Sequence, residues 1–316
     1  MSAPDRIDVH QHIVPPAWAR ALAQRGLDSG GWAIPAWSAE SAIEMMDQQG
    51  ISTGILSVTS PGVYLADGET REAKSLARDV NEYGAQMAQE HPGRIGHFAS
   101  VPLPDPDAAT EEAVHALDVL GADGVVLMSN ARGRYLGDPD FDPLWAELDR
   151  RSAVVFVHPA QPPMSLLPGT PAPLADYVFD TTRTALNLVL NGTMKRYTKV
   201  KVILSHGGGF LPYAAYRFSG LTATVVDRSQ NPDDIIRDLK RFYFDTALSA
   251  SPSALPALLA FAEPGHILYG SDWPFAPKEA GTYYNQYLEA YPDLSPAQMH
   301  AINRANAEAL FPRLQR

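Results

Sequence analysis

The chain has 316 residues, 45% of them hydrophobic, and carries a formal net charge of −11 at pH 7. This acidic composition argues against nucleic-acid binding, because phosphate contacts need a basic face. The absence of cysteine excludes disulfides, thiolate catalysis and cysteine-type zinc sites. The N-terminus is short and polar, and no apolar run approaches the roughly 18 residues of a membrane span. We therefore expect a cytoplasmic protein that does not enter membranes.

Short β-rich runs alternate with amphipathic helical stretches along the sequence, and no low-complexity linker divides them. This alternation predicts an α/β fold in which crossover helices join parallel strands. The expected strands are Ile7–Val9, Gly54–Val58, Ile95–Val101, Gly124–Met128, Val154–Val157, Lys201–Leu204, Phe242–Asp245 and Ile267–Tyr269. Eight strands are typical of a (β/α)8 TIM barrel. The sequence therefore predicts a single barrel domain over residues 1–316.

Local signals mark several helix ends between these strands. One helix is expected to begin after Ser38 and to end at Gly50, because serine and glycine favour the two ends of a helix. Apolar periodicity predicts further helices over Asp105–Leu120 and Pro296–Phe311. The stretch Pro15–Pro35 has only weak periodicity, and we interpret it as a small insertion over the mouth of the barrel.

Two histidines follow the first expected strand at alternate positions. Asp8, His10 and His12 point to one side, because successive strand residues face opposite ways. Two imidazoles on one face at the mouth of a barrel suit a divalent ion. The alternative is a pair of partly exposed histidines in a loop, so this motif needs support from other strands.

That support comes from three more strands, each with an ionisable residue just past its last apolar position. These residues are His158, His206 and Asp272. Three histidines and one carboxylate make a four-ligand set with room for water. We predict that His10, His12, His158 and Asp272 bind one metal ion. The fifth residue, His206, is then free for acid–base catalysis.

The fourth expected strand is not followed by a residue of the kind that bridges two metal ions. It ends in Met128, Ser129 and Asn130, with no lysine, aspartate or glutamate at its tip. No residue at this position can bridge a second metal ion. The sequence therefore predicts a mononuclear site.

Substrate-binding residues are harder to select. Arg183 opens the helix after the His158 loop and is a candidate for binding a carboxylate, since an acidic chain needs a local cation for that purpose. Trp32, Trp37, Phe210 and Trp273 are candidates for an aromatic pocket, with core or lid packing as the alternative for each. Other arginines that could bind a carboxylate are Arg132, Arg134 and Arg217.

Taken together, these motifs resemble the amidohydrolase superfamily, and within it the branch of non-oxidative decarboxylases related to aminocarboxymuconate-semialdehyde decarboxylase. The matching segments are Ile7–His12, Val155–Pro159, Ile203–Gly209, Phe244–Thr246, Tyr269–Pro274 and Asn303–Phe311. The resemblance implies that His10, His12, His158 and Asp272 bind one zinc or manganese ion. It implies that His206 is catalytic. Within the branch, Thr181–Thr184 and Asn187–Lys195 look most similar to the 6-methylsalicylate decarboxylases.

The function that this resemblance implies is decarboxylation of an ortho-hydroxy aromatic acid. The metal would bind the phenolate and a carboxylate oxygen, and Asp272 would deliver a proton to the ring carbon, with His206 tuning it or positioning the substrate. The ligand set alone does not separate this reaction from metal-dependent hydrolysis of a lactone or amide. A non-catalytic metal-binding barrel is a further alternative. We expect Zn²⁺, with Mn²⁺ as the alternative, and a homodimer.

Overall fold

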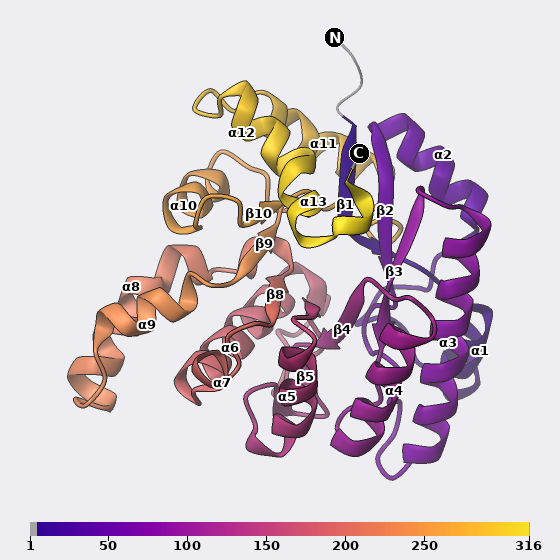
Figure 1. The fold of residues 1–316 in the computed structure, drawn as a ribbon, viewed down its shortest axis with the longest axis horizontal. Helices are drawn as coiled ribbons and strands as arrows, with labels where there is room; N and C mark the ends of the chain where they lie inside the picture. Colours follow the sequence, from indigo (N-terminus) through magenta and orange to yellow (C-terminus); the bar gives the residue numbers. More distant parts are fainter. Residues whose placement is uncertain (1–4, 316) are drawn as a thin grey trace.

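The computed structural model describes residues 5–315; residues 1–4 and 316 of the predicted domain lie outside the described part. Its central element is a sheet of eight parallel strands in the order β1-β2-β3-β4-β7-β8-β9-β10 (Figure 1). The strands are β1 (Arg6–His12), β2 (Ile51–Ser57), β3 (Ile95–Ser100), β4 (Gly124–Met128), β7 (Val154–His158), β8 (Lys201–Leu204), β9 (Tyr243–Asp245) and β10 (Ile267–Leu268). Each coincides with an expected strand, so the predicted strand order is confirmed.

The sheet curves until its first and last strands meet. The backbone N–H of Val9 donates to the carbonyl of Tyr269 at 3.0 Å, and that of His12 donates to the carbonyl of Trp273 at 2.7 Å. These bonds close the barrel between β1 and the segment that follows β10. The carboxyl ends of all eight strands therefore surround one mouth.

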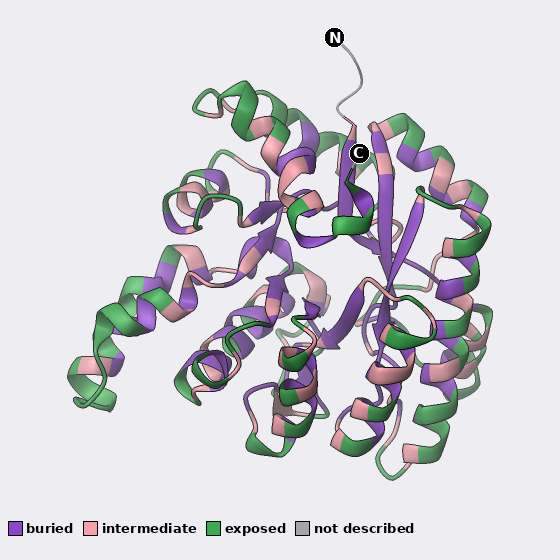
Figure 2. Cartoon of the chain, viewed as in Figure 1, coloured by how far each residue is buried: buried purple, intermediate pink, exposed green. Residues whose placement is uncertain are grey.

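Helices surround this barrel, with their buried faces toward the strands and their exposed faces outward (Figures 1 and 2). They are α1 (Pro16–Arg25), α2 (Ala39–Gln49), α3 (Thr70–Glu90), α4 (Pro106–Asp118), α5 (Asp142–Arg150), α6 (Asp176–Leu190), α7 (Thr193–Arg196), α8 (Leu211–Leu221), α9 (Pro232–Leu239), α10 (Ala254–Phe261), α11 (Lys278–Glu289), α12 (Pro296–His300) and α13 (Asn306–Leu310). A short antiparallel hairpin of β5 (Asn130–Ala131) and β6 (Arg134–Tyr135) follows β4.

The predicted helix signals act as expected. Ser38 accepts a hydrogen bond from the Ser41 backbone in a capping box, and Gly50 ends the helix with a φ of 65°. Asp105 caps α4. The last predicted helix runs from Pro296 to Leu310 but contains a π-helical turn at Ala301–Ala305, which periodicity alone does not reveal.

The predicted insertion after β1 reaches the barrel mouth with the turn that contains Ser29 and Trp32. It also contains a helix, α1, that the weak periodicity of Pro15–Pro35 did not predict; this helix buries Trp18 and Leu22 and packs beside α3. After α1, Ser29 and Trp32 pair through two backbone hydrogen bonds in a tight turn. The Ser29 hydroxyl donates to the Ser60 carbonyl at 2.8 Å, which fixes this turn above the strand ends.

An apolar layer lies directly beneath the mouth. Val126, Phe156 and Ile203 are in register across β4, β7 and β8, and Phe98 stacks on Phe156 with ring centroids 5.5 Å apart. The other edge of Phe156 meets the ring of His10 at 4.9 Å. The core thus supports the first histidine of the predicted metal site from below.

Candidate metal centre

The structure brings four of the predicted site residues into one cluster. His10 and His12 lie at the end of β1, His158 ends β7, and Asp272 follows β10. One donor atom from each lies within 4.8 Å of the others, and all four side chains are buried. The three strands that carry them are separated along the chain, and closure of the barrel places their ends together.

The spacing of the donor atoms fits a single ion. His10 Nε2 lies 3.2 Å from His12 Nε2, and these two atoms lie 3.0 and 2.9 Å from Asp272 Oδ1. Neighbouring donors around an ion with bonds of about 2.0–2.2 Å are roughly 3–3.5 Å apart. The arrangement therefore matches adjacent positions in one coordination sphere.

Each histidine of the cluster also has a partner on its other ring nitrogen. His10 Nδ1 lies 2.7 Å from Asp245 Oδ2, His12 Nδ1 lies 3.1 Å from the Ser57 carbonyl, and His158 Nδ1 lies 2.8 Å from the Pro159 carbonyl. Donation from Nδ1 leaves the Nε2 lone pairs pointing into the cluster, as metal-binding histidines require.

The electrostatics of the cluster favour a bound cation. Burial lowers the pKa of His12 and brings that of His158 well below its usual range, so both imidazoles are neutral. Burial also opposes charge on His10, but Asp245 and Asp272 raise its pKa to about 10. Burial raises the pKa of Asp272, yet His10 and its other imidazole partners hold it well below its usual range. An anionic pocket that keeps one proton on His10 is also a pocket for a divalent ion.

His206 lies beside this cluster and outside it. It sits in a short 3-10 turn after β8, with a positive φ of 54° that is uncommon for a non-glycine residue. Its Nε2 is 3.5 Å from Asp272 Oδ2, the carboxylate oxygen that faces away from the other histidines. Its Nδ1 is buried and has no hydrogen-bond partner among the described residues. This is the placement expected of a residue that acts on substrate and does not bind the ion.

A family model described as amidohydrolase matches residues 7–313. The chain belongs to the amidohydrolase family. It is 41% identical to a 6-methylsalicylic acid decarboxylase of Penicillium expansum, over 98% of this chain and 97% of that protein. The resemblance inferred from the motifs is thus confirmed.

Solved structures agree with this assignment. A crystal structure of an amidohydrolase II protein is 32% identical, with a TM-score of 0.90 over 98% of this chain and all of that one. A dihydroxybenzoic acid decarboxylase of Polaromonas sp. JS666, solved with manganese and 2-nitroresorcinol, has the same fold: its TM-score is 0.80 at 24% identity, over 99% of this chain and 98% of that one. Within the part of the chain that the structure describes, no helix could span a bilayer.

Two further aspartates organise the amidohydrolase site, and the sequence motifs did not assign them a role. Asp245, at the end of β9, holds His10 Nδ1 with one oxygen and accepts from the backbone N–H of His206 at 2.8 Å with the other. Asp8 accepts from the Ser271 hydroxyl at 2.6 Å and from the Ser271 backbone at 3.0 Å. Burial raises the pKa of Asp8 to about 7 although these bonds lower it. The signal for Asp245 was its place as the last residue of the expected strand Phe242–Asp245.

A cavity of about 230 Å³ opens above the cluster. Its wall combines polar groups near the ion site with apolar groups farther out. Its lining residues are Ser29, Trp32, Thr59, His158, Pro173, Leu174, Tyr177, Val178, His206, Leu248, Ser249, Asp272, Phe275 and Tyr284. No lysine or arginine of residues 5–315 lines it, and its histidines are His158 and His206.

Of the predicted substrate-binding residues, Trp32 lines this cavity, whereas Arg183, Phe210 and Trp273 do not. Arg183 is exposed on α6 and donates to the Tyr135 hydroxyl at 3.4 Å. Phe210 packs edge-on against Phe179 with ring centroids 5.0 Å apart, and Trp273 packs against the outer core. Arg183 is exposed although its helix neighbours Thr182 and Thr184 are buried, so its side chain does not enter the cavity.

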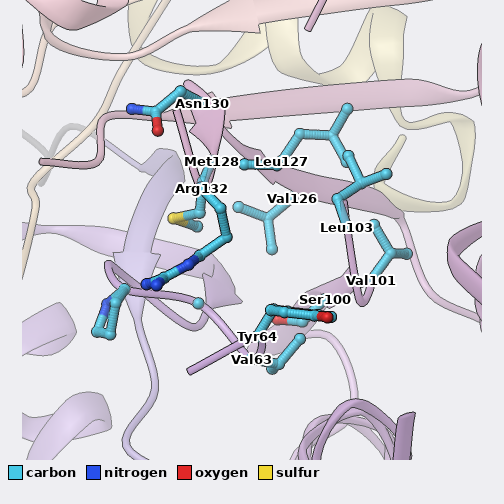
Figure 3. Close-up of a pocket in the computed structure, with 13 residues that line it drawn as sticks. Val63, Tyr64, Ser100, Val101, Leu103, Val126, Leu127, Met128, Asn130 and Arg132 are labelled. Atoms are coloured by element: carbon cyan, nitrogen blue, oxygen red, sulfur yellow. The ribbon is translucent and has the colours of Figure 1, made fainter. Parts of the chain in front are cut away.

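A second, smaller cavity lies beside β4, and Figure 3 shows its lining. Apolar residues such as Val101 and Leu127 form its floor, and Arg132 extends across it in this view. The Arg132 guanidinium pairs with Asp67 at 2.9 Å. At about 50 Å³ this cavity is too small for an aromatic acid and contains no residue of the histidine cluster. The cavity above the cluster, which is lined by His158, His206 and Asp272, is therefore the candidate active site.

Proposed function

We propose that the protein is a metal-dependent, non-oxidative decarboxylase of an ortho-hydroxy aromatic acid such as 6-methylsalicylate or salicylate. The similarity to a 6-methylsalicylic acid decarboxylase over nearly the whole length supports this substrate class. The observation that carries the proposal is the pair formed by His206 Nε2 and Asp272 Oδ2, at the base of a cavity whose outer wall is largely apolar. A planar acid can lie over this pair while its polar edge faces the ion site.

We further propose that His10, His12, His158 and Asp272 hold one divalent ion, Zn²⁺ or alternatively Mn²⁺. The convergent Nε2 atoms, their Nδ1 partners and the shared carboxylate oxygen support a mononuclear site. Imidazole and carboxylate donors suit both metals. When bound, the ion supplies Lewis acidity and positive charge for a phenolate and a carboxylate. Elemental analysis should give close to one equivalent per chain, and two tightly held equivalents would contradict the proposal.

The roles of the protein groups follow from their positions. Asp272 presents Oδ1 to His10 and His12 and Oδ2 to His206, so a proton held between Asp272 and His206 lies at the substrate side of the cluster. Transfer of this proton forms a C–H bond at the ring carbon that bears the carboxylate. The C–C bond then breaks, its electron pair restores the aromatic ring, and CO2 leaves. No oxidant or reductant is needed, and a positioned acid contributes roughly 10²–10⁴-fold.

An experiment in heavy water tests this reaction directly. The metal-loaded protein should release CO2 from 6-methylsalicylate and give a phenol with one deuterium at the carbon that carried the carboxylate. Aromatic lactones and amides should remain intact in parallel incubations. Addition of water to those compounds, without CO2 release from any ortho-hydroxy acid, would favour the hydrolase alternative.

We also propose that the protein forms a homodimer in the cytoplasm. The support for association is an exposed apolar surface on α8 and the turn after it, where Tyr213 is 86% and Val226 is 78% exposed. In Figure 1, α8 and α9 extend away from the barrel. Large exposed apolar patches mark contact surfaces. Sedimentation should give a dimer that Tyr213→Glu dissociates, and a wild-type species of only 34.3 kDa would count against it.

A further inference from the structure

A buried carboxylate outside the metal cluster occupies the end of β4, where the sequence shows no metal ligand. Asp180 of α6 is fully buried. It accepts hydrogen bonds from the Ser129 hydroxyl, from the side-chain amide of Asn130 at 2.7 Å and from the Tyr135 hydroxyl at 2.7 Å. Among the described residues, no lysine or arginine hydrogen-bonds to it. These three donors offset the cost of burying its charge.

Ser129 connects this carboxylate to the segment that carries His158. Its backbone N–H donates to the His158 carbonyl at 2.7 Å. Its hydroxyl accepts from the Ala160 backbone N–H at 2.9 Å. Because the same hydroxyl gives its hydrogen to Asp180, its lone pair is directed to Ala160. The backbone on both sides of the His158 side chain is therefore fixed through one serine.

Neighbouring contacts extend the same link. The amide of Asn130 donates to the Gln161 carbonyl at 3.1 Å as well as to Asp180. On α6, three residues before Asp180, Tyr177 enters the cavity wall with its ring 6.3 Å from that of His158. The carboxylate thus lies at the junction of β4, the loop after β7 and the helix that forms part of the substrate wall.

We propose that Asp180 is a positioning residue that sets the direction of His158 toward the ion, acting through Ser129 and the backbone of residues 158–160. The proposal rests on the proposed metal-binding role of His158. Asp180 does not line the cavity and is not in the donor cluster, so it does not touch the ion or the substrate itself. Arg183, at the outer edge of the same network, donates to Tyr135.

The substitution Asp180→Asn tests this role, because it keeps the shape of the side chain but replaces one acceptor oxygen with a donor. With a single acceptor oxygen, asparagine cannot accept from Ser129, Asn130 and Tyr135 in the present arrangement, and the network that holds Ala160 would loosen. We expect Co²⁺ affinity to fall about 10- to 100-fold, the range for outer partners of metal ligands. The visible absorption of bound Co²⁺, which reports its ligand geometry, should also change.

Glu112→Gln provides a matched control. Glu112 is another buried carboxylate, held by Asn81 at 2.8 Å and by Arg78, and it lies on α4 in the outer helical layer. Its substitution should lower thermal stability while Co²⁺ affinity and absorption stay at the wild-type values. A purely structural role for Asp180 predicts the same behaviour for Asp180→Asn. Wild-type Co²⁺ affinity and absorption in that variant would overturn the proposal.

Ser129→Ala gives an independent test if Asp180→Asn does not fold. It removes the hydroxyl that joins Asp180 to Ala160 and should weaken Co²⁺ binding to a similar extent. In the double variant the two losses should not add, because both break the same link. A folded Ser129→Ala protein with wild-type Co²⁺ affinity would also refute the role. If the folded wild-type protein bound no Co²⁺, Zn²⁺ or Mn²⁺, the proposed metal site itself would fail, which is a separate result.

Discussion

The floor and the wall of the cavity are held in different ways. On the floor, His10, His12 and His158 are at most 2% exposed, and each has a hydrogen-bond partner behind it. On the wall, Trp32 is 41% and Leu174 is 65% exposed; Trp32 comes from the turn after α1, and Leu174 ends a short 3-10 helix in the loop between β7 and α6. Strand ends thus fix the groups that need exact geometry, and loops supply the surface that selects the substrate.

The largest losses of turnover are expected from substitutions of His206 and Asp272, which face each other at the base of the cavity. His206→Asn should keep close to one metal ion per chain and lose about 10²–10⁴-fold in turnover, because an acid–base group is removed and no ligand is. Asp272→Asn should lose at least as much turnover and also bind metal more weakly, since a neutral amide is a poorer ligand. Metal content and rate are measured on the same preparations. Loss of metal from His206→Asn together with normal metal and rate in Asp272→Asn would mean that the two roles are exchanged.

A smaller effect is expected from substitution of Asp245, which hydrogen-bonds to His10 behind the proposed metal site. Asp245→Asn keeps an oxygen for the backbone of His206 but turns an amide toward His10 Nδ1. Because the orientation of His10 depends on that acceptor, metal affinity should fall about 10- to 100-fold. Competition with a chromophoric chelator measures this loss. Unchanged metal affinity would show that metal binding by His10 does not depend on its hydrogen bond to Asp245.

The stability of the metal-free protein should depend on pH differently from that of the metal-bound protein. In the metal-free protein, Asp245 and Asp272 raise the pKa of His10 to about 10 against burial. The bound proton therefore stabilises the fold fully below the unfolded pKa of roughly 6.5, and this contribution is lost as the pH rises to about 10. Between about pH 6.5 and 10, the affinity of the protein for a divalent ion should also rise about tenfold per pH unit, because the ion displaces the proton of His10.

Thermal unfolding with a chelator and with saturating Zn²⁺, between neutral and alkaline pH, checks this expectation. The melting temperature of the chelated protein should fall as the pH rises, and the gap between the two proteins should widen. A gap that stays constant across the range would mean that no proton is exchanged for the ion.

The smallest effects are expected on and behind the wall. Trp32→Ala should raise KM for the aromatic acid about three- to tenfold, or roughly 0.7–1.4 kcal/mol, with little change in kcat or metal content. Arg183→Ala serves as its control: Arg183 is exposed and contacts Tyr135, so the geometry now predicts a change within about twofold. A larger rise in KM for Arg183→Ala would support the original prediction that Arg183 binds the substrate carboxylate.

The sequence was sufficient to predict the strands and the cluster of four donor residues. Each strand is a short apolar run, and in a closed barrel the residue just past such a run must lie at the mouth. His158 and Asp272 could be selected by this rule without knowing which strands are neighbours. Asp245 is the last residue of an expected strand, so a rule that includes this position also selects it.

The wall could not be predicted in the same way. The direction of a side chain on a helix depends on how the helix is rotated against the barrel, and a shift of one position turns it by about 100°. Arg183 was placed by its sequence neighbourhood, and Trp32 was only one of four aromatic candidates. Tyr177, which was not a candidate, reaches the cavity through the packing of α6. Weak periodicity also concealed α1, because only Trp18 and Leu22 of its residues are buried.

The closure between β1 and the segment after β10 has a consequence for synthesis of the chain. His10 and His12 leave the ribosome early, but the donor set is complete only when Asp272 has emerged, 260 residues after His12. A nascent chain that stops before Asp272 lacks the carboxylate that binds both imidazoles. A circularly permuted chain that joins the present ends and opens elsewhere would place these donors close in sequence. Such a chain would complete its donor set at a different stage of translation while keeping the same barrel.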